Sequence, residues 1–210
     1  VVTGVETKKV YILTGHKERA STRDLATGLI EPVGFDLALE GLLRDNYSVQ
    51  ALNLMQIKEV PEDAAALVIA GPTQELDPEE YEALDNYLSG GGRLITLLDP
   101  NSPQSFRDLI AEWGIKTYSD TLADAGSSVA GYVLTPLMQR ANGQFISTDL
   151  SGIGITSQID VVFFPGATAI ESTVLAEDIP PQTRFVPLAM TTQASWLETN
   201  VDNPRPDPEL

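Results

Sequence analysis

Short apolar runs alternate with stretches of helical periodicity through the first half of the chain. Continuous runs at residues 10–14, 67–70 and 94–98 predict buried strands, and a weaker run at 47–54 predicts a fourth. Three helical faces are also present, and their apolar members are Phe35, Leu39, Leu42 and Leu43, then Tyr81, Leu84 and Leu88, then Phe106, Leu109, Ile110 and Trp113. The alternation predicts a three-layer αβα sandwich with a mostly parallel central sheet, in which the first three runs lie side by side at the centre.

Residues at the expected helix ends agree with this pattern. Asp77 suits an N-cap, Pro78 suits the first turn, and Glu80 completes a capping box. Gly90 stands where a left-handed C-cap is expected, and Gly114 ends the third helix. The glycine run at 90–92 follows a helix and precedes a strand, so it is predicted to stop the helix and not to bind phosphate.

The second half has a weaker pattern. Strands are predicted near residues 129–134, 160–164, 168–175 and 185–190, with few helices, so the C-terminal half should be richer in β-structure. We expect a single α/β domain over residues 1–198, followed by a Pro-rich acidic tail at 199–210. The helical face at 106–113 should be buried in this core.

The charge and composition exclude several classes of function. The 210 residues carry 13 Lys and Arg against 30 Asp and Glu, a net charge of -17, which disfavours nucleic acid as a partner. The absence of cysteine excludes thiol nucleophiles, thiolate metal sites and disulfides. No apolar run approaches the ~20 residues that span a bilayer, so this chain should not itself cross a membrane. Its ends suggest a piece of a longer protein whose flanking membrane segments lie outside it.

Candidate chemistry gathers where the loops leave the carboxyl ends of the predicted parallel strands. His16, the only histidine, follows the first strand, and two interpretations remain open for it. It could be a general base oriented by Glu18 or Asp99, or an imidazole that hydrogen-bonds neighbouring loops. Asp99 either binds a ligand or opens a turn before Pro100. The residues expected to contact a ligand or partner are Gly15, His16, Glu18, Gly71, Pro72, Thr73 and Asp99.

No cofactor or metal is expected at these loops. Only Glu18, Glu75 and Asp99 could act as hard metal ligands, and they are scattered along the sequence. No nucleophile-elbow or Ser/His/Asp pattern is present, so no catalytic residue is assigned.

Several short motifs occur in the order that is typical of one family. They are Thr-Gly-His at 14–16, Pro-Glu-Asp-Ala at 61–64, Ala-Gly-Pro at 70–72, Tyr-Leu followed by the glycine run and Leu-Asp-Pro at 87–100, and the Thr-Thr-Gln-Ala-Ser-Trp segment at 191–196. With them the chain resembles, over residues 8–198, the auxiliary GldG-like component of gliding-motility-type ABC transporters. Where that family carries His-Pro-Ile-Thr, this chain has Ile-Gly-Ile-Thr at 153–156, so a second family histidine is missing.

The resemblance implies an extracytoplasmic domain, anchored at the cell membrane by flanking helices and associated with an ABC permease and other membrane subunits. It also implies a fold similar to class I glutamine amidotransferases and to flavodoxin-like proteins. The amidotransferase chemistry is not implied, because its cysteine nucleophile is absent. We therefore expect a non-catalytic domain that binds a small molecule, a peptide or a partner. The alternatives are a hydrolase or transferase that uses His16 as base, and a structural spacer.

Overall fold

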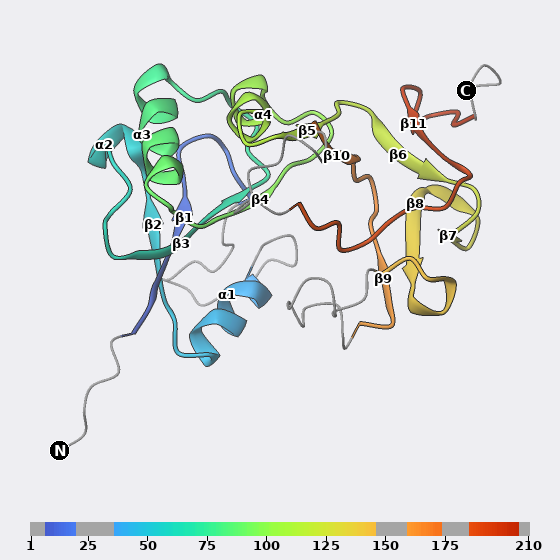
Figure 1. The fold of residues 1–210 in the computed structure, drawn as a ribbon, viewed down its shortest axis with the longest axis horizontal. Helices are drawn as coiled ribbons and strands as arrows, with labels where there is room; N and C mark the ends of the chain where they lie inside the picture. Colours follow the sequence, from blue (N-terminus) through green and yellow to red (C-terminus); the bar gives the residue numbers. More distant parts are fainter. Residues whose placement is uncertain (1–6, 20–35, 146–158, 174–184, 206–210) are drawn as a thin grey trace. The chain divides into compact units, whose positions relative to one another are not determined.

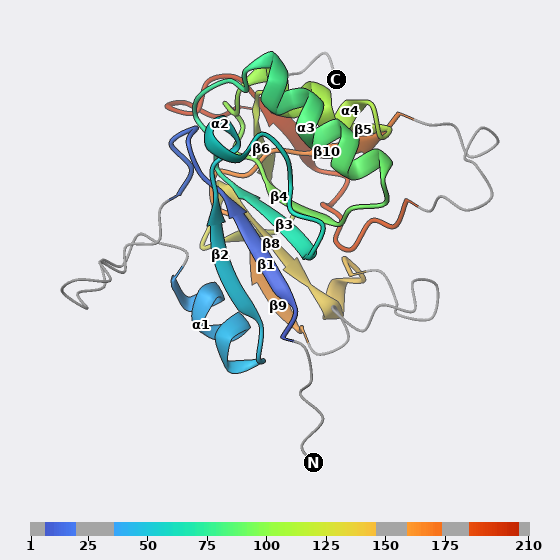
Figure 2. The ribbon, with the colours of Figure 1, turned by 90° about the vertical axis from the view of Figure 1, so that its left-hand side faces the viewer.

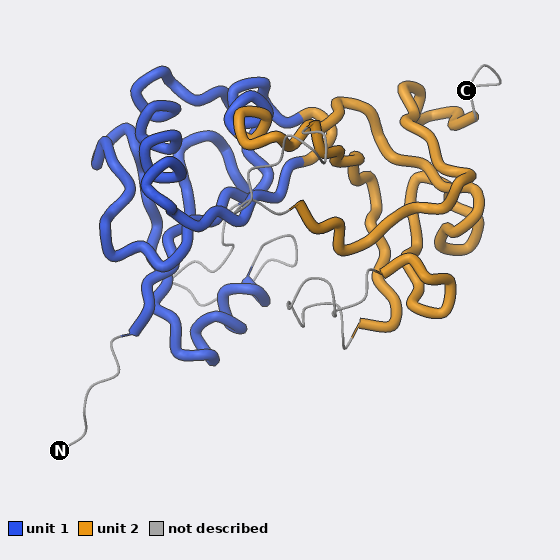
Figure 3. The backbone as a smooth tube through the Cα atoms, in the orientation of Figure 1, with its two compact units in different colours: residues 1–98, 102–109 blue, residues 99–101, 110–210 orange. Residues whose placement is uncertain are grey.

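The computed structural model describes residues 7–19, 36–145, 159–173 and 185–205. Contacts within the chain divide it into two compact units (Figure 3). Unit 1 comprises residues 1–98 and 102–109, and unit 2 comprises residues 99–101 and 110–210. The expectation of a single domain over residues 1–198 stays a prediction, because this division does not show whether either unit folds without the other.

Unit 1 is built on a four-stranded parallel sheet (Figure 1). Its strands are β1 (Lys9–Leu13), β2 (Ser48–Leu52), β3 (Ala64–Ala70) and β4 (Leu94–Leu97), in the order β2-β1-β3-β4. The three continuous apolar runs are thus neighbours and parallel, as the sequence predicted. The prediction that all three lie at the centre is wrong for β4, which is the last strand of this sheet.

Four helices accompany the sheet: α1 (Asp36–Arg44), α2 (Leu54–Ile57), α3 (Pro78–Ser89) and α4 (Gln104–Ala111). Helices α3 and α4 lie along one side of the strands (Figure 2). The core combines alternate residues of β1 and β3 with residues of β2, α2, α3, α4 and the loop after β3, namely Tyr11, Leu13, Leu52, Leu54, Leu67, Ile69, Leu76, Ala83, Leu84, Phe106 and Leu109. Unit 1 is therefore of the mixed α/β class, whereas the complete three-layer sandwich of flavodoxin-like or amidotransferase-like type stays a prediction.

Two predicted apolar faces need correction. Phe106, Leu109 and Ile110 are buried, but the side chain of Trp113 is 48% exposed, because α4 ends at Ala111 and the chain turns away from the helical register. On α1, Leu43 is 50% exposed, and Phe35 lies outside the described residues.

The capping of α3 is confirmed at its start and corrected at its end. A capping box joins Asp77 and Glu80, with Pro78 in the first turn. Gly90 has φ −75°, so the left-handed position falls one residue later, at Gly91 with φ +87°. The next residue, Gly92, lies against the ring of Tyr87, where an added Cβ would be 2.5 Å from ring atoms. The glycine run therefore terminates the helix, as predicted.

Unit 2 contains short antiparallel strands: β5 (Ile115–Thr117), β6 (Thr121–Asp124), β7 (Ser128–Val129), β8 (Tyr132–Gln139), β9 (Val161–Phe163), β10 (Ile170–Ser172) and β11 (Ser195–Glu198). One 3-10 helix, η1 (Arg140–Asn142), follows β8. The strands pair as β10-β5, β11-β6 and β7-β8-β9. The predicted strand at 185–190 is wrong, since this segment holds only an isolated bridge between Ala189 and Phe145, while β6 and β11 were not predicted.

A buried carboxylate organises the segment with the Thr-Thr-Gln-Ala-Ser-Trp motif. Asp124 is fully buried and accepts hydrogen bonds from the backbone N–H of Gly126 (2.9 Å), Ser127 (3.1 Å) and Thr192 (2.8 Å). The hydroxyl of Thr192 donates a fourth bond to the same carboxylate. This motif therefore has a structural role, because it fixes the chain just before β11.

Among the helices of the described residues, none combines the length and the apolar character that a membrane span requires.

Candidate functional site

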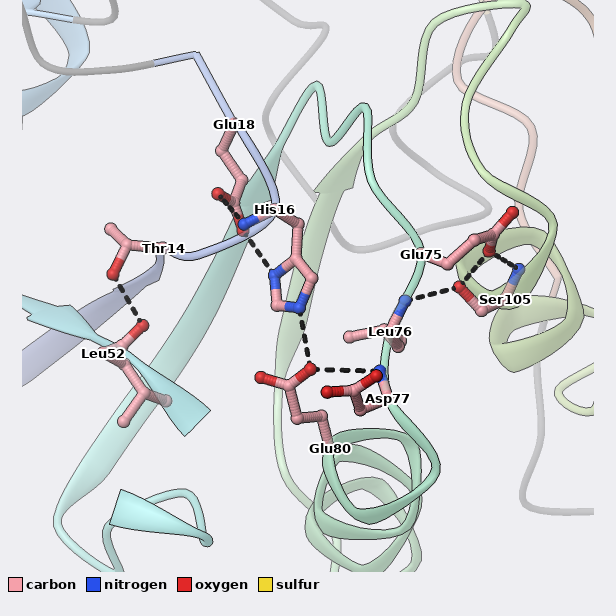
Figure 4. Close-up of polar contacts among 9 residues, drawn as sticks. All are labelled: Thr14, His16, Glu18, Leu52, Glu75, Leu76, Asp77, Glu80 and Ser105. Carbon is pink, nitrogen blue, oxygen red and sulfur yellow. Dashed lines mark hydrogen bonds and ion pairs between the residues drawn. The ribbon is translucent and has the colours of Figure 1, made fainter. Parts of the chain in front are cut away.

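His16 follows β1 in unit 1 and lies between two carboxylates (Figure 4). Its Nδ1 is 3.0 Å from Oε1 of Glu18, and its Nε2 is 2.9 Å from Oε2 of Glu80. Only 3% of His16 is exposed, and both carboxylate side chains are similarly buried. The edge of the imidazole contacts Phe106, with ring centroids 5.6 Å apart and planes at 78°. The ring is thus enclosed by two acceptors and an aromatic side chain.

The two contacts of the ring favour the protonated imidazole. A neutral imidazole donates from only one nitrogen, whereas an ionised carboxylate can only accept. Both nitrogens of His16 face carboxylate oxygens, so the protonated ring satisfies both contacts at once. The hydrogen bond with Glu18, supported by the one with Glu80, raises the pKa of His16 above its ordinary value of 6.5 despite the opposing effect of burial.

Glu18 binds both the ring and the backbone of His16. Its Oε2 accepts the backbone N–H of His16 at 2.9 Å while Oε1 contacts the ring. Burial alone would raise the pKa of Glu18, but the hydrogen bonds from the His16 ring and from backbone N–H groups outweigh it and lower that pKa below 4.5. The residue between them, Lys17, adopts a left-handed conformation with φ +53°, which an L side chain rarely adopts. This conformation occurs between His16 and Glu18, where the Glu18 carboxylate turns back to bind the backbone N–H and the Nδ1 of His16.

Glu80 brings the first turn of α3 to the same ring. Its Oε2 accepts both the His16 Nε2–H and the backbone N–H of Asp77, the latter at 3.0 Å. The other oxygen, Oε1, is buried and has no hydrogen-bond partner among the described residues. Glu80, a member of the capping box of α3, therefore also connects the helix to the loop after β1.

Backbone hydrogen bonds join the loop after β1 to the loop after β3. The carbonyl of His16 accepts the N–H groups of Thr73 (2.9 Å) and Gln74 (3.1 Å), and Arg19 N–H donates to the carbonyl of Ala70 at 2.7 Å. Gly71, with φ +59°, lies under the Arg19 side chain, where a Cβ would come within 2.9 Å of Nε. The two loops consequently form one hydrogen-bonded unit.

Six of the predicted site residues therefore lie together in unit 1. Within this group His16, Gly71 and Pro72 are buried and the Glu18 side chain is enclosed, whereas Gly15 and Thr73 are exposed. Gly15 has φ +126°, another backbone conformation that favours glycine. Asp99 belongs to unit 2, where it precedes a turn at residues 100–101, and it stays a separate candidate.

In the described parts of the chain, no three His, Asp or Glu side chains are grouped so that they could hold a metal ion. Glu75, a candidate ligand in the sequence, instead caps α4. Its carboxylate accepts the backbone N–H of Gln104 (3.0 Å) and of Ser105 (2.8 Å), and the Ser105 hydroxyl in turn accepts the N–H of Leu76 (2.9 Å; Figure 4). The Ser105 hydroxyl also donates to Glu75. This bond, together with those from the backbone N–H groups of Ser105 and Gln104, lowers the pKa of the Glu75 carboxyl.

Sequence reasoning missed Glu80 as a site residue. It was interpreted only as half of a capping box, which is correct, but its second contact joins residues 64 positions apart. The expected departure from the family motif at 153–156 lies outside the described residues.

Comparison with known proteins shows the family to which the chain belongs. Residues 7–210 match the family described as "ABC-type uncharacterized transport system". The chain belongs to this family. Its members are auxiliary components, so this ABC-transport auxiliary chain is part of a membrane-associated transport system whose partners are membrane transporter subunits. No curated protein matches its sequence.

One solved structure similar to this ABC-transport auxiliary chain is titled "mmIFT52 N-terminal domain". It has a TM-score of 0.58 and 17% sequence identity, over 90% of this chain and 75% of the other. At this identity the likeness concerns the fold alone.

Proposed function

We propose that this chain is a non-catalytic, extracytoplasmic binding domain of its transport system, of the GldG-like type. The exposed surface of the two loops after β1 and β3 would bind a segment of a membrane subunit. Two observations support this: membership of the transport family, and the burial of the only histidine in a contact that fixes both loops. The second observation carries the proposal.

The state of His16 argues against general-base catalysis. A base must hold a lone pair within hydrogen-bond reach of the substrate proton. In His16 one ring nitrogen is directed to Glu18 and the other to Glu80, and the contacts raise its pKa, so the ring holds its proton more firmly. A buried imidazolium with both donors engaged is suited to fixing structure. This supports the non-catalytic alternative over the hydrolase or transferase.

The division of the site into buried and exposed members supports a binding surface. The imidazole and both carboxylates lie inside, where they determine the backbone positions of the loops. Gly15 and Thr73 are exposed, and the Thr73 N–H donates to the carbonyl of His16, the residue after Gly15. Loops held rigidly on a sheet bind with little loss of conformational entropy, which favours recognition of a partner.

Site-specific photo-cross-linking in native membranes tests this surface. The full-length protein would carry benzoylphenylalanine at Thr73 in one variant and at Glu82, exposed on α3 of the same unit, in the control. We expect the Thr73 probe to capture a permease subunit and the Glu82 probe not to. Equal capture at both positions, or capture only at Glu82, would contradict the proposed surface. Capture at neither would favour a structural spacer.

A turnover assay tests the absence of catalysis. The purified chain should not hydrolyse amide, ester or phosphoester substrates above the rate of the His16→Asn variant, because the imidazole has no free lone pair to offer. Reproducible hydrolysis that is lost in His16→Asn would favour the enzyme alternative.

A further inference from the structure

The three titratable groups of the site differ in how firmly each is held. Glu80 lies in the first turn of α3 and is fixed by the Asp77 N–H as well as by the ring. Glu18 lies on a loop, and its carboxylate is held by the His16 ring, by the His16 backbone N–H and by its own backbone N–H, all within that loop. A change in the charge of the ring should therefore affect the position of Glu18 before that of Glu80.

The charged side chains on the neighbouring elements do not make the contacts that the imidazolium proton makes. The neighbouring acid at the start of α3 is its N-cap Asp77, which is exposed, and α4 places the uncharged ring of Phe106 against the imidazole. The loop after β3 presents backbone N–H groups, which bind the His16 carbonyl and not its ring. The basic residues of the loop after β1 are Lys17 and Arg19, and both are exposed. The balance within the cluster thus depends on one proton.

We propose that His16, Glu18 and Glu80 form a proton-dependent latch, in which loss of the imidazolium proton releases Glu18 and the segment at residues 16–19 from the loop after β3. This inference concerns the regulation of the surface described above and rests on the proposed function. The latch is closed while the ring is charged and opens as the pH rises.

The geometry explains the direction of release. A neutral ring retains one N–H, and donation from Nε2 keeps the better-fixed partner, Glu80. The lone pair of Nδ1 then faces the lone pairs of Glu18 Oε1 at 3.0 Å, which is repulsive. Because Glu18 lies on a loop, it can reach water by moving its own segment. That movement would strain the bonds that Thr73 and Gln74 donate to the His16 carbonyl.

Amide hydrogen exchange of the 210-residue chain, followed by NMR between about pH 5.5 and about pH 9, tests the latch. The reporters are the N–H groups of His16, Arg19, Thr73 and Gln74, each of which is hydrogen-bonded in the closed state. After correction for the intrinsic rate, their protection should fall by about tenfold or more as the pH rises, because a charge-assisted bond is lost.

Glu18→Gln separates the latch from a general effect of pH. Its amide oxygen can accept the His16 N–H while its NH₂ group donates to Nδ1 of a neutral ring, so the same loop position is kept without the proton. We expect Glu18→Gln to stay protected at alkaline pH. Glu79→Gln, which alters an exposed carboxylate paired with Lys58, should behave like the wild type.

Unchanged protection in the wild type over this range, or an equal loss of protection in Glu18→Gln, would overturn the latch. The experiment uses the chain without its membrane partners. A failed cross-link at Thr73 would therefore leave the exchange result standing, and a flat exchange profile would leave the cross-link standing.

Discussion

At the scale of single residues, both units contain buried carboxylates that accept hydrogen bonds from specific donors. In unit 1, Glu18 and Glu80 share one imidazole. In unit 2, Asp124 accepts backbone N–H groups from two places in the chain. Buried carboxylates of this kind stabilise only while every donor is in place, because each donor loses its own hydration on burial.

Asp124→Ala should destabilise the chain by about 3 kcal/mol or more, since it leaves the N–H groups of Gly126, Ser127 and Thr192 without their acceptor. Urea unfolding followed by tryptophan fluorescence measures the loss, with Trp196 only four residues from Thr192 as one probe. The exposed residue Asp202 provides the control, and Asp202→Ala should change stability by less than about 0.5 kcal/mol. Equal effects of the two substitutions would contradict this role for Asp124.

At the scale of elements, the end of α3 illustrates how a motif can be structural. The hydroxyl of Tyr87 accepts the Arg93 N–H and donates to the Arg93 carbonyl, both at 3.0 Å, so the ring spans the turn between α3 and β4. Gly92 lies directly against this ring. The glycine run and Tyr87 thus act together to end α3 and to fix the turn that leads into β4.

Gly92→Ala should destabilise the chain by ~1–3 kcal/mol, because its Cβ would force the Tyr87 ring out of both hydrogen bonds. Gly41→Ala is the matched control. Position 41 lies within α1 with nothing within 4 Å of an added Cβ, so alanine there should stabilise by ~0.5–1 kcal/mol. Thermal unfolding of both variants decides between opposite signs, and a Gly92→Ala variant as stable as the wild type would refute the contact.

The success of sequence analysis also differed between elements. The runs that became β1 and β3 were recognisable because buried parallel strands read as continuous apolar segments. The run of β4 reads the same way, although Ile95 and Leu97 on this last strand of the sheet are exposed. The strands of unit 2 are short and pair over long separations, as β11 does with β6, so local pattern could not locate them. His16 and its loops were predicted to meet from strand ends alone, whereas the contact with Glu80 depends on three-dimensional packing.

At the scale of the whole molecule, stability should depend on pH through the site. The pKa of His16 is raised in the folded state, so its contribution is complete below the unfolded value of 6.5 and is lost as the pH rises through the folded pKa. The pKa of Glu18 is lowered, so its contribution is complete above 4.5 and is lost as the pH falls through the folded pKa.

Together these two groups predict a stability maximum between about pH 4.5 and about pH 6.5. Unfolding free energies from urea titrations across this range measure it. In His16→Gln the alkaline decline should be reduced. An unchanged decline in that variant would assign the pH dependence to other groups.

The central claim is that His16 is a buried imidazolium shared by two carboxylates. Nitrogen NMR of the ring tests it most directly, and the single histidine gives one unambiguous pair of ring signals. At pH 6.5, where an ordinary imidazole is half protonated, the account predicts a predominantly charged ring with protons on both Nδ1 and Nε2. A neutral ring at this pH, with one nitrogen unprotonated, would contradict it.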